Sequence, residues 1–283
     1  MAMNGTKECF TLLIALLLTM LCSCGKNAKI MDEAERIVGQ SPDSSLALLS
    51  TVDRYSLSKS DRARYGLLFT MAQDKSGLDV DMDTLIRQSY IYYKGEPETK
   101  YYGLSQYYMG KYYFLNDSTT QCEECFRNVI NNAKERGDVD LQCLALEKLS
   151  RSIVLSNTKQ SIEYARQGVA LYKTSKTRKS ANIIYYTLNL AFSFAMDGQK
   201  DSAFAYLRQA KGMFVSNLKK RYPSLSDDDI QMCMLILIGL SNEDMANIYC
   251  ITINSMKRKL YSFKEKMGIT DKNQSVRNVI LGL

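Results

Sequence analysis

Apolar side chains recur every three or four residues along most of the chain beyond residue 30, the spacing that places them on one face of an α-helix. Three stretches share one layout, in which two amphipathic runs are separated by a short polar break. The breaks lie at residues 116–117, 156–157 and 197–199. Each stretch therefore predicts a helical hairpin, that is, two antiparallel helices joined by a tight turn.

The hairpins repeat with a period of about forty residues. The small residue early in each second helix is Cys122, Ser161 or Ala203, and successive ones are 39 and 42 residues apart. Ser44 and Met82 fall near the same phase farther upstream. Because a lone hairpin cannot bury its apolar face, stacked hairpins form a continuous core with a concave groove. The chain has only 3 prolines and 15 glycines, few for the many turns of a sandwich or barrel, so we expect an all-α fold.

This layout resembles the tetratricopeptide repeat over residues 30–215. The matching positions are Gly110, Tyr113, Cys122, Phe126 and Val129 in one unit, Ser161, Ala165 and Gly168 in the next, and Ala191, Phe194, Ala203, Leu207 and Ala210 in the last. The units are longer than the usual length of about 34 residues, and the terminal proline of the consensus is missing. The resemblance implies a helical-hairpin solenoid that binds a protein or peptide in its groove.

Tyrosines occur in adjacent pairs within this region, at 92–93, 101–102, 107–108, 112–113 and 185–186. Neighbouring helix positions point in different directions, so we expect one ring of each pair inward and the other toward the flank of its hairpin. Packing is the favoured role, with the phenol groups finding partners at the rim. The alternative is a tyrosine-lined groove for a peptide or small ligand.

The last part of the chain has a different pattern. Pro223 interrupts the helical periodicity, and Ser226 followed by three aspartates predicts an N-cap and the first turn of a new helix. We expect helices over 230–238, 245–249 and 254–267, the last ended by Gly268. Three short helices joined by tight turns predict a small helix-turn-helix domain over residues 223–283.

The same segment resembles the LuxR-type helix-turn-helix from Leu225 to Ile269. The resemblance is carried by Leu225-Ser226, the run from Gly239 to Ala246, Ser255-Met256 and the run from Lys266 to Ile269. In that family the third helix lies in the major groove of DNA. The resemblance implies that Thr252 caps this helix, that Lys266 approaches a phosphate, and that its DNA-facing side includes Asn254, Ser255, Lys257, Arg258 and Lys259. One departure is Asp228, which stands where the family usually has arginine.

The N-terminal segment has the pattern of a targeting signal. Lys7 precedes the apolar run 10–21, which is too short to span a membrane but fits the core of a secretory signal. The run ends in Leu21-Cys22-Ser23-Cys24, which resembles a bacterial lipobox. That resemblance implies a lipoprotein signal over residues 1–24 that is cleaved just before Cys24, lipid attachment to Cys24, and membrane association. The alternative is a short membrane anchor that is never cleaved.

Candidate catalytic chemistry is scarce. The sequence contains no histidine, which excludes Ser-His-Asp and Cys-His catalysis and histidine metal sites. Cys122 and Cys125 have the spacing of a redox pair or half a zinc site, but no second such pair exists, and we expect both in the core. We therefore expect no catalytic residue, metal or cofactor. The net charge of +7 permits an anionic partner without naming one.

Two hypotheses for function follow. The first is a transcriptional regulator whose repeats bind a protein, a peptide or a second copy of the chain and thereby control DNA binding by the helix-turn-helix. The second is a membrane-anchored lipoprotein scaffold whose helix-turn-helix is vestigial. The two ends of the chain predict opposite locations, because a lipobox directs export whereas a DNA-binding domain belongs in the cytoplasm. An uncleaved anchor with a cytoplasmic remainder, an exported lipoprotein, or DNA binding only when export fails would each resolve the conflict.

Overall fold

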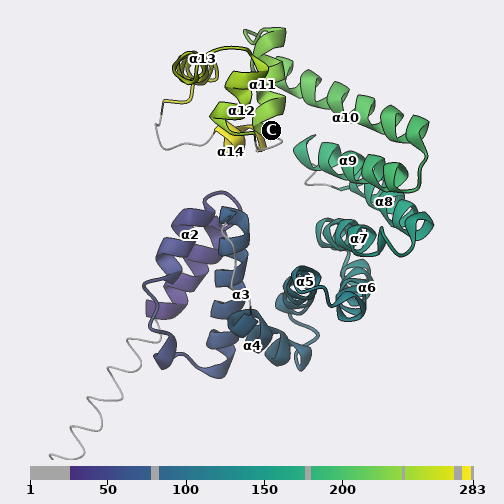
Figure 1. The fold of residues 1–283 in the computed structure, drawn as a ribbon. Helices are drawn as coiled ribbons and strands as arrows, with labels where there is room; N and C mark the ends of the chain where they lie inside the picture. Colours follow the sequence, from purple (N-terminus) through teal and green to yellow (C-terminus); the bar gives the residue numbers. More distant parts are fainter. Residues whose placement is uncertain (1–25, 78–82, 176–179, 238–239, 271–275, 282–283) are drawn as a thin grey trace, which may run out of the picture. The chain divides into compact units, whose positions relative to one another are not determined.

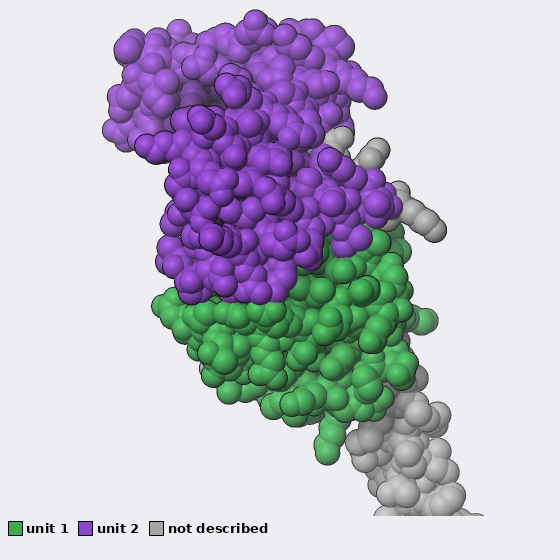
Figure 2. All heavy atoms as spheres, turned by 90° about the vertical axis from the view of Figure 1, so that its right-hand side faces the viewer, with its two compact units in different colours: residues 1–152 green, residues 153–283 purple. Residues whose placement is uncertain are grey.

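The computed structural model describes residues 26–77, 83–175, 180–237, 240–270 and 276–281. Within these ranges the chain is helical and contains no strand, which confirms the predicted all-α class. None of the helices found there combines the length and the apolar character needed to cross a membrane. The chain divides into two compact units, residues 1–152 and 153–283 (Figure 2).

The first unit is a series of helices that pack mainly against their neighbours in sequence (Figure 1). A helical segment over residues 26–37 comes first. It is followed by α2 (Pro42–Leu49), the short 3-10 helix η1 (Arg54–Ser56), α3 (Lys59–Ser76), α4 (Asp83–Lys94), α5 (Lys100–Leu115), α6 (Thr119–Arg136) and α7 (Val139–Ile153), whose last residue lies in the second unit. The pairs α3–α4 and α5–α6 are helical hairpins. The second is the predicted hairpin with its break at residues 116–117, whereas for the first the sequence indicates only that Met82 falls near the repeat phase.

The α5–α6 hairpin packs as the repeat pattern requires. Cys122, Phe126 and Val129 of α6 are completely buried. Gly110 of α5 lies so close to α6 that a Cβ added there would be 2.8 Å from Phe126 Cε1. The absence of a side chain at Gly110 therefore lets the two helices approach each other closely.

The α3–α4 hairpin has a similar close approach at Gly66, which is not among the repeat positions matched from the sequence. A Cβ on Gly66 of α3 would lie 2.6 Å from Ser89 Oγ and 2.8 Å from the main-chain oxygen of Leu85, both in α4. Ser89 is fully buried, and its hydroxyl donates a hydrogen bond of 2.8 Å to the Ala63 carbonyl oxygen. The predicted equivalent in this hairpin, Met82, lies outside the described residues.

Two other details of the predicted phase differ from the structure. In α2 the buried small residue is Ser45, whose hydroxyl donates to the Ala34 carbonyl oxygen, whereas Ser44 is exposed. In the last repeat Leu207 is 43% exposed, and the ring of Tyr206 stacks on Phe194 instead, at 5.4 Å between centroids. Ser44 is followed by another serine, and Leu207 is preceded by an aromatic residue. The sequence pattern alone therefore assigned the buried position to the wrong member of each adjacent pair.

The tyrosine pairs have mainly structural roles. Tyr93 and Tyr186 are buried while Tyr92 and Tyr185 are more accessible, as expected for one inward and one outward ring. The other three pairs differ from this expectation. Both rings of the pair at 107–108 are buried in α5 and meet edge to face at 5.2 Å, and both members of the pairs at 101–102 and 112–113 are partly exposed. The Tyr101 hydroxyl donates to Glu35 and so links α5 to the first helical segment.

The second unit contains the last repeat and the C-terminal module. Its helices are α8 (Thr158–Tyr172), α9 (Ser180–Met196), α10 (Lys200–Arg221), α11 (Asp227–Leu237), α12 (Asn242–Ile248), α13 (Ile253–Lys266) and α14 (Val276–Leu281). Helix α9 packs against α8 and α10, α12 packs against α13, and α14 packs against α11 (Figure 1). The three helices predicted for the C-terminal module are present. Helix α11 begins at Asp227, directly after the predicted N-cap Ser226, and α12 begins at Asn242, three residues before the expected start at 245.

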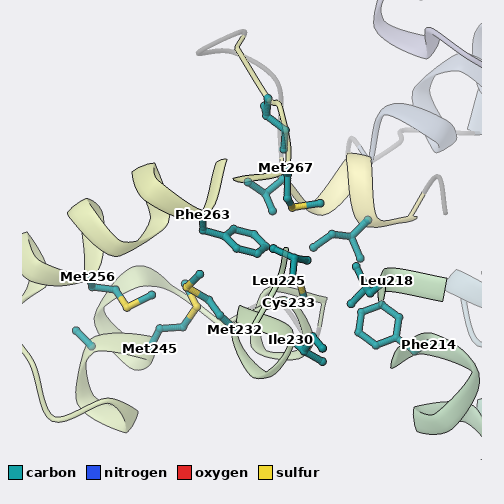
Figure 3. Close-up of a cluster of buried hydrophobic side chains, with 14 residues drawn as sticks. Phe214, Leu218, Leu225, Ile230, Met232, Cys233, Met245, Met256, Phe263 and Met267 are labelled. Atoms are coloured by element: carbon teal, nitrogen blue, oxygen red, sulfur yellow. The ribbon is translucent and has the colours of Figure 1, made fainter. Parts of the chain in front are cut away.

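One hydrophobic core joins α10 to the C-terminal module. Phe214 and Leu218 of α10 point into a buried cluster with Leu225 and Ile230 (Figure 3). The same cluster continues through α12, α13 and α14 with Met245, Ala246, Met256, Phe263, Met267, Ile269, Val276 and Ile280. The long second helix of the last repeat is therefore also part of the core of the C-terminal module.

Candidate nucleic-acid interface

Helix α13 is held in place by a capped start and a buried apolar face. The Thr252 hydroxyl accepts a hydrogen bond of 3.2 Å from the Ser255 amide, so Thr252 is the N-cap that the sequence predicts. Met256 and Phe263 are buried against α11 and α12 in the shared core. The opposite face of α13 is left exposed, which is the arrangement that a helix needs in order to enter a groove of DNA.

The exposed face carries three of the predicted contact residues. Asn254, Lys257 and Arg258 are all exposed, and neither Lys257 nor Arg258 forms an ion pair with any described residue. Tyr261, which is 65% exposed, lies on the same face, since residues 254, 258 and 261 are spaced by four and three positions. We call Asn254, Lys257, Arg258 and Tyr261 the α13 ridge. The spacing of Tyr261 from Arg258 was the sequence signal that could have identified it.

Ser255 differs from the ridge residues because it belongs to the cap. Its side chain is only partly exposed, and its hydroxyl lies 3.0 Å from that of Thr252. A hydroxyl engaged in this way supports the start of the helix, and it is less available for a partner.

Lys259 is directed toward the first helix of the module rather than outward. Its ammonium group forms an ion pair with Asp228 of α11 and lies 4.7 Å from the centre of the Tyr249 ring, just after α12. The Tyr249 hydroxyl donates a hydrogen bond of 3.3 Å to the main-chain oxygen of Asp228. Burial, together with the nearby Asp228 carboxylate, raises the pKa of Tyr249 to about 12. Lys259 is thus held by one group from each of two other segments.

Lys266 is held in a similar way by the next aspartate. Its ammonium group lies 2.8 Å from a carboxylate oxygen of Asp229, whose side chain is only 7% exposed. The same oxygen accepts hydrogen bonds from the Ser226 amide and hydroxyl and so caps α11. Burial alone would raise the pKa of Asp229, but the hydrogen bonds from Lys266 and Ser226 outweigh it and lower the pKa. Asp229 therefore both caps the start of α11 and forms the ion pair with Lys266.

The predicted contact residues consequently fall into three groups. Asn254, Lys257 and Arg258 lie together on the α13 ridge, and Thr252 and Ser255 form the cap. Lys259 and Lys266 are drawn toward the acidic start of α11. The remaining predicted site residue, Cys24, lies outside the described residues.

The cysteines of the repeats are core residues. Cys122 and Cys125 are buried on adjacent turns of α6, and burial raises the pKa of their thiols to about 11 and about 12. Such thiols remain protonated and unreactive near neutral pH. No cluster of potential metal ligands occurs in the parts of the chain that the structure describes.

A second exposed surface lies on the last repeat. Tyr185, Leu188, Phe192 and Met196 of α9 are each at least 40% exposed, and their spacing of three, four and four residues places them on one face. Helix α9 contains no charged side chain. We call these four residues the α9 stripe. A contiguous apolar surface of this kind is typical of a protein-binding site.

Comparison with known proteins supports the helical-repeat architecture. No protein-family model matches the sequence, and no curated protein matches it. Two crystal structures of nearly identical TPR-like repeats from a kinesin-light-chain-like protein of Podosopora anserina are similar to this chain. Their TM-scores are 0.53 and 0.52, each with 16% sequence identity, and the matches cover 69% and 68% of this chain and 97% and 96% of the others. The repeat region is therefore a TPR-like helical fold.

Proposed function

We propose that this protein is a regulator that binds duplex DNA through α13 and a protein partner through its helical repeats. The observation that carries the proposal is the α13 ridge, where an amide and two cations that pair with no described carboxylate share one exposed helix face. Arginine and asparagine are the side chains that most often read guanine and adenine in the major groove. Lysine adds attraction to the phosphates, which carry no sequence information.

The local construction supports the same assignment. The turn between α12 and α13 is tight, since it spans residues 249–252 and includes Cys250 at a positive φ of 51°. Both helices begin with a side-chain cap, at Ser241 and Thr252. A rigid turn and a capped third helix would present the first turn of α13 to base edges.

Replacing Lys257 and Arg258 together by alanine tests DNA binding. We expect the affinity of the full-length chain for a random-sequence duplex to fall by at least tenfold, because two charge-assisted contacts are lost. Fluorescence anisotropy with a labelled duplex at low salt measures the change. A matched control is the exposed pair Lys220 and Arg221 at the end of α10, whose replacement by alanine removes the same charge. An equal loss of affinity for the duplex in the two variants would mean that net charge, and not the α13 ridge, attracts DNA.

The repeats would supply the controlling interaction. The fold is of the TPR-like type, and stacked hairpins of this type present surfaces suited to peptide and protein segments. The exposed, uncharged α9 stripe favours a partner with an apolar contact face. Helix α9 packs on α10, and α10 shares its core with the C-terminal module. A partner bound to the α9 stripe would therefore be separated from the module by one helix only.

The α9 stripe also favours the second candidate, a lipoprotein scaffold without DNA binding. We propose two measurements that separate the candidates by location. A topology reporter fused after Leu283 should be active in the cytoplasm if the regulator assignment is right. Palmitate labelling that disappears in Cys24→Ala, together with cleavage of the C-terminus by external protease, would instead support the scaffold.

A further inference from the structure

The basic side chains of α13 differ in what faces them. Lys257 and Arg258 are exposed and form no ion pair with a described residue. Lys259 and Lys266 face α11, where each meets a different one of three consecutive aspartates. The third of these aspartates, Asp227, is 91% exposed and pairs with Lys219 of α10 instead.

The Lys259 contact is more than a loose surface ion pair. The Lys259 side chain is only partly exposed, and its ammonium group lies beside the Asp228 carboxylate and also faces the Tyr249 ring. Tyr249 in turn donates to the main chain at Asp228, which fixes the ring relative to α11. Cation–π contact and ion pairing act on the same ammonium group, so Lys259 is held in a defined position.

Lys266 is held by a carboxylate that has little freedom to move. Asp229 is buried and caps the first turn of α11 through Ser226. A lysine attached to such a group stays near the start of α11 unless the pair is broken. Both lysines are therefore engaged before any nucleic acid arrives.

These pairs have a direct consequence for binding to DNA. Each phosphate neutralised by a lysine or arginine releases counterions and makes the logarithm of the affinity fall by about 0.9 per tenfold increase in salt. Lysines paired with carboxylates do not contribute in this way, and the carboxylates themselves repel the phosphate backbone. Binding without sequence preference depends almost wholly on such phosphate contacts. Base contacts from the α13 ridge are not reduced by the same pairs.

We propose that Asp228 and Asp229 act as an acidic latch, which holds Lys259 and Lys266 away from phosphates and makes DNA binding depend on the α13 ridge. This inference rests on the proposed DNA binding and assigns its regulation. A closed latch favours selective binding of low affinity, whereas an open latch adds two phosphate contacts and favours tight binding to any duplex.

The latch is tested with the full-length chain and a labelled random-sequence duplex, by anisotropy over a series of salt concentrations. Asp228→Asn should raise the low-salt affinity about tenfold and steepen the salt dependence by about 0.9, as expected for one added phosphate contact. Asp227→Asn is the matched control, because it removes the same charge from the neighbouring residue without touching a lysine of α13. Its salt dependence should equal that of the unmodified chain.

A second substitution tests whether Asp228 acts through Lys259. In a chain that already carries Lys259→Gln, Asp228→Asn should no longer steepen the salt dependence. Asp229→Asn should also steepen the salt dependence, but it weakens the cap of α11 at the same time. The conclusion therefore rests on Asp228, whose side chain is 49% exposed and can be replaced with less effect on the fold.

The outcomes separate the latch from the function on which it rests. Equal salt dependence in Asp228→Asn and Asp227→Asn, with clear binding by the unmodified chain, would overturn the latch and leave DNA binding intact. If Asp228→Asn still steepened the salt dependence in a chain carrying Lys259→Gln, the latch would also be overturned, since the carboxylate would then act by repulsion alone. Absence of binding by every variant, at low salt, would overturn both proposals together. Binding by the latch variant alone would support a latch that is fully closed.

Discussion

Gly66→Ala is expected to destabilise the first unit by about 3 kcal/mol, although it adds only one methyl group. The new Cβ would lie 2.8 Å from the main-chain oxygen of Leu85 and 2.6 Å from Ser89 Oγ. A main-chain atom of a packed helix cannot move aside cheaply, and the Ser89 hydroxyl is already committed to the Ala63 carbonyl oxygen. Relief would require α3 and α4 to separate, which opens a gap along the whole hairpin. This cost exceeds the gain of up to about 1 kcal/mol that alanine normally brings to a helix.

Chemical denaturation followed by circular dichroism measures this effect. The control is Gly212→Ala in α10, because no atom of the described residues lies within 4 Å of a Cβ added there. That exchange should raise stability by about 0.5–1 kcal/mol through helix propensity alone. A Gly66→Ala variant as stable as the unmodified chain would show that α3 and α4 adjust freely, contrary to the close packing described above.

Phe214→Ala is expected to destabilise the C-terminal module by about 3–5 kcal/mol, although Phe214 belongs to the second helix of the last repeat. The ring is 7% exposed and fills the cluster that Leu225, Ile230 and the later helices also form. Removing it leaves a cavity where α10 meets the module. Loss of packing there should loosen α11 to α14 before the earlier repeats.

Hydrogen exchange of individual segments shows where the stability is lost. We expect faster exchange over α11 to α14 in Phe214→Ala and little change in the first unit. Phe204→Ala is a suitable comparison, because Phe204 lies on the same helix but is 59% exposed, and its loss should alter exchange only slightly. Uniform acceleration along the whole chain would instead indicate that the module has no separate stability.

Local periodicity accounts for most of the architecture. Cys122, Phe126 and Val129 are fully buried as predicted, because their spacing follows one face of α6. The caps at Ser226 and Thr252 were also predictable, since a helix start depends on neighbouring residues only. Gly66 was missed because its role depends on a close approach to α4, and glycine in a helix carries no apolar signal of its own.

The candidate site was predictable in part for the same reason. The positions of Asn254, Lys257 and Arg258 on one exposed face follow from the helical period and from the burial of Met256. The partners of Lys259 and Lys266 lie 31 and 37 residues upstream, so no local pattern reveals them. Three consecutive aspartates predict a helix start, yet the sequence does not show that each of them meets a different lysine.

The core shared by α10 and the C-terminal module determines how the module could be transplanted. A chimaera joined at Pro223 would leave Phe214 and Leu218 behind and expose the apolar surface that they cover. A junction in the turn at residues 197–199 would carry the whole of α10 and keep that surface sealed. The smallest segment that could be transplanted as a folded unit therefore begins at the start of α10, and any domain fused in front of it would have to end in a helix that packs as α9 does.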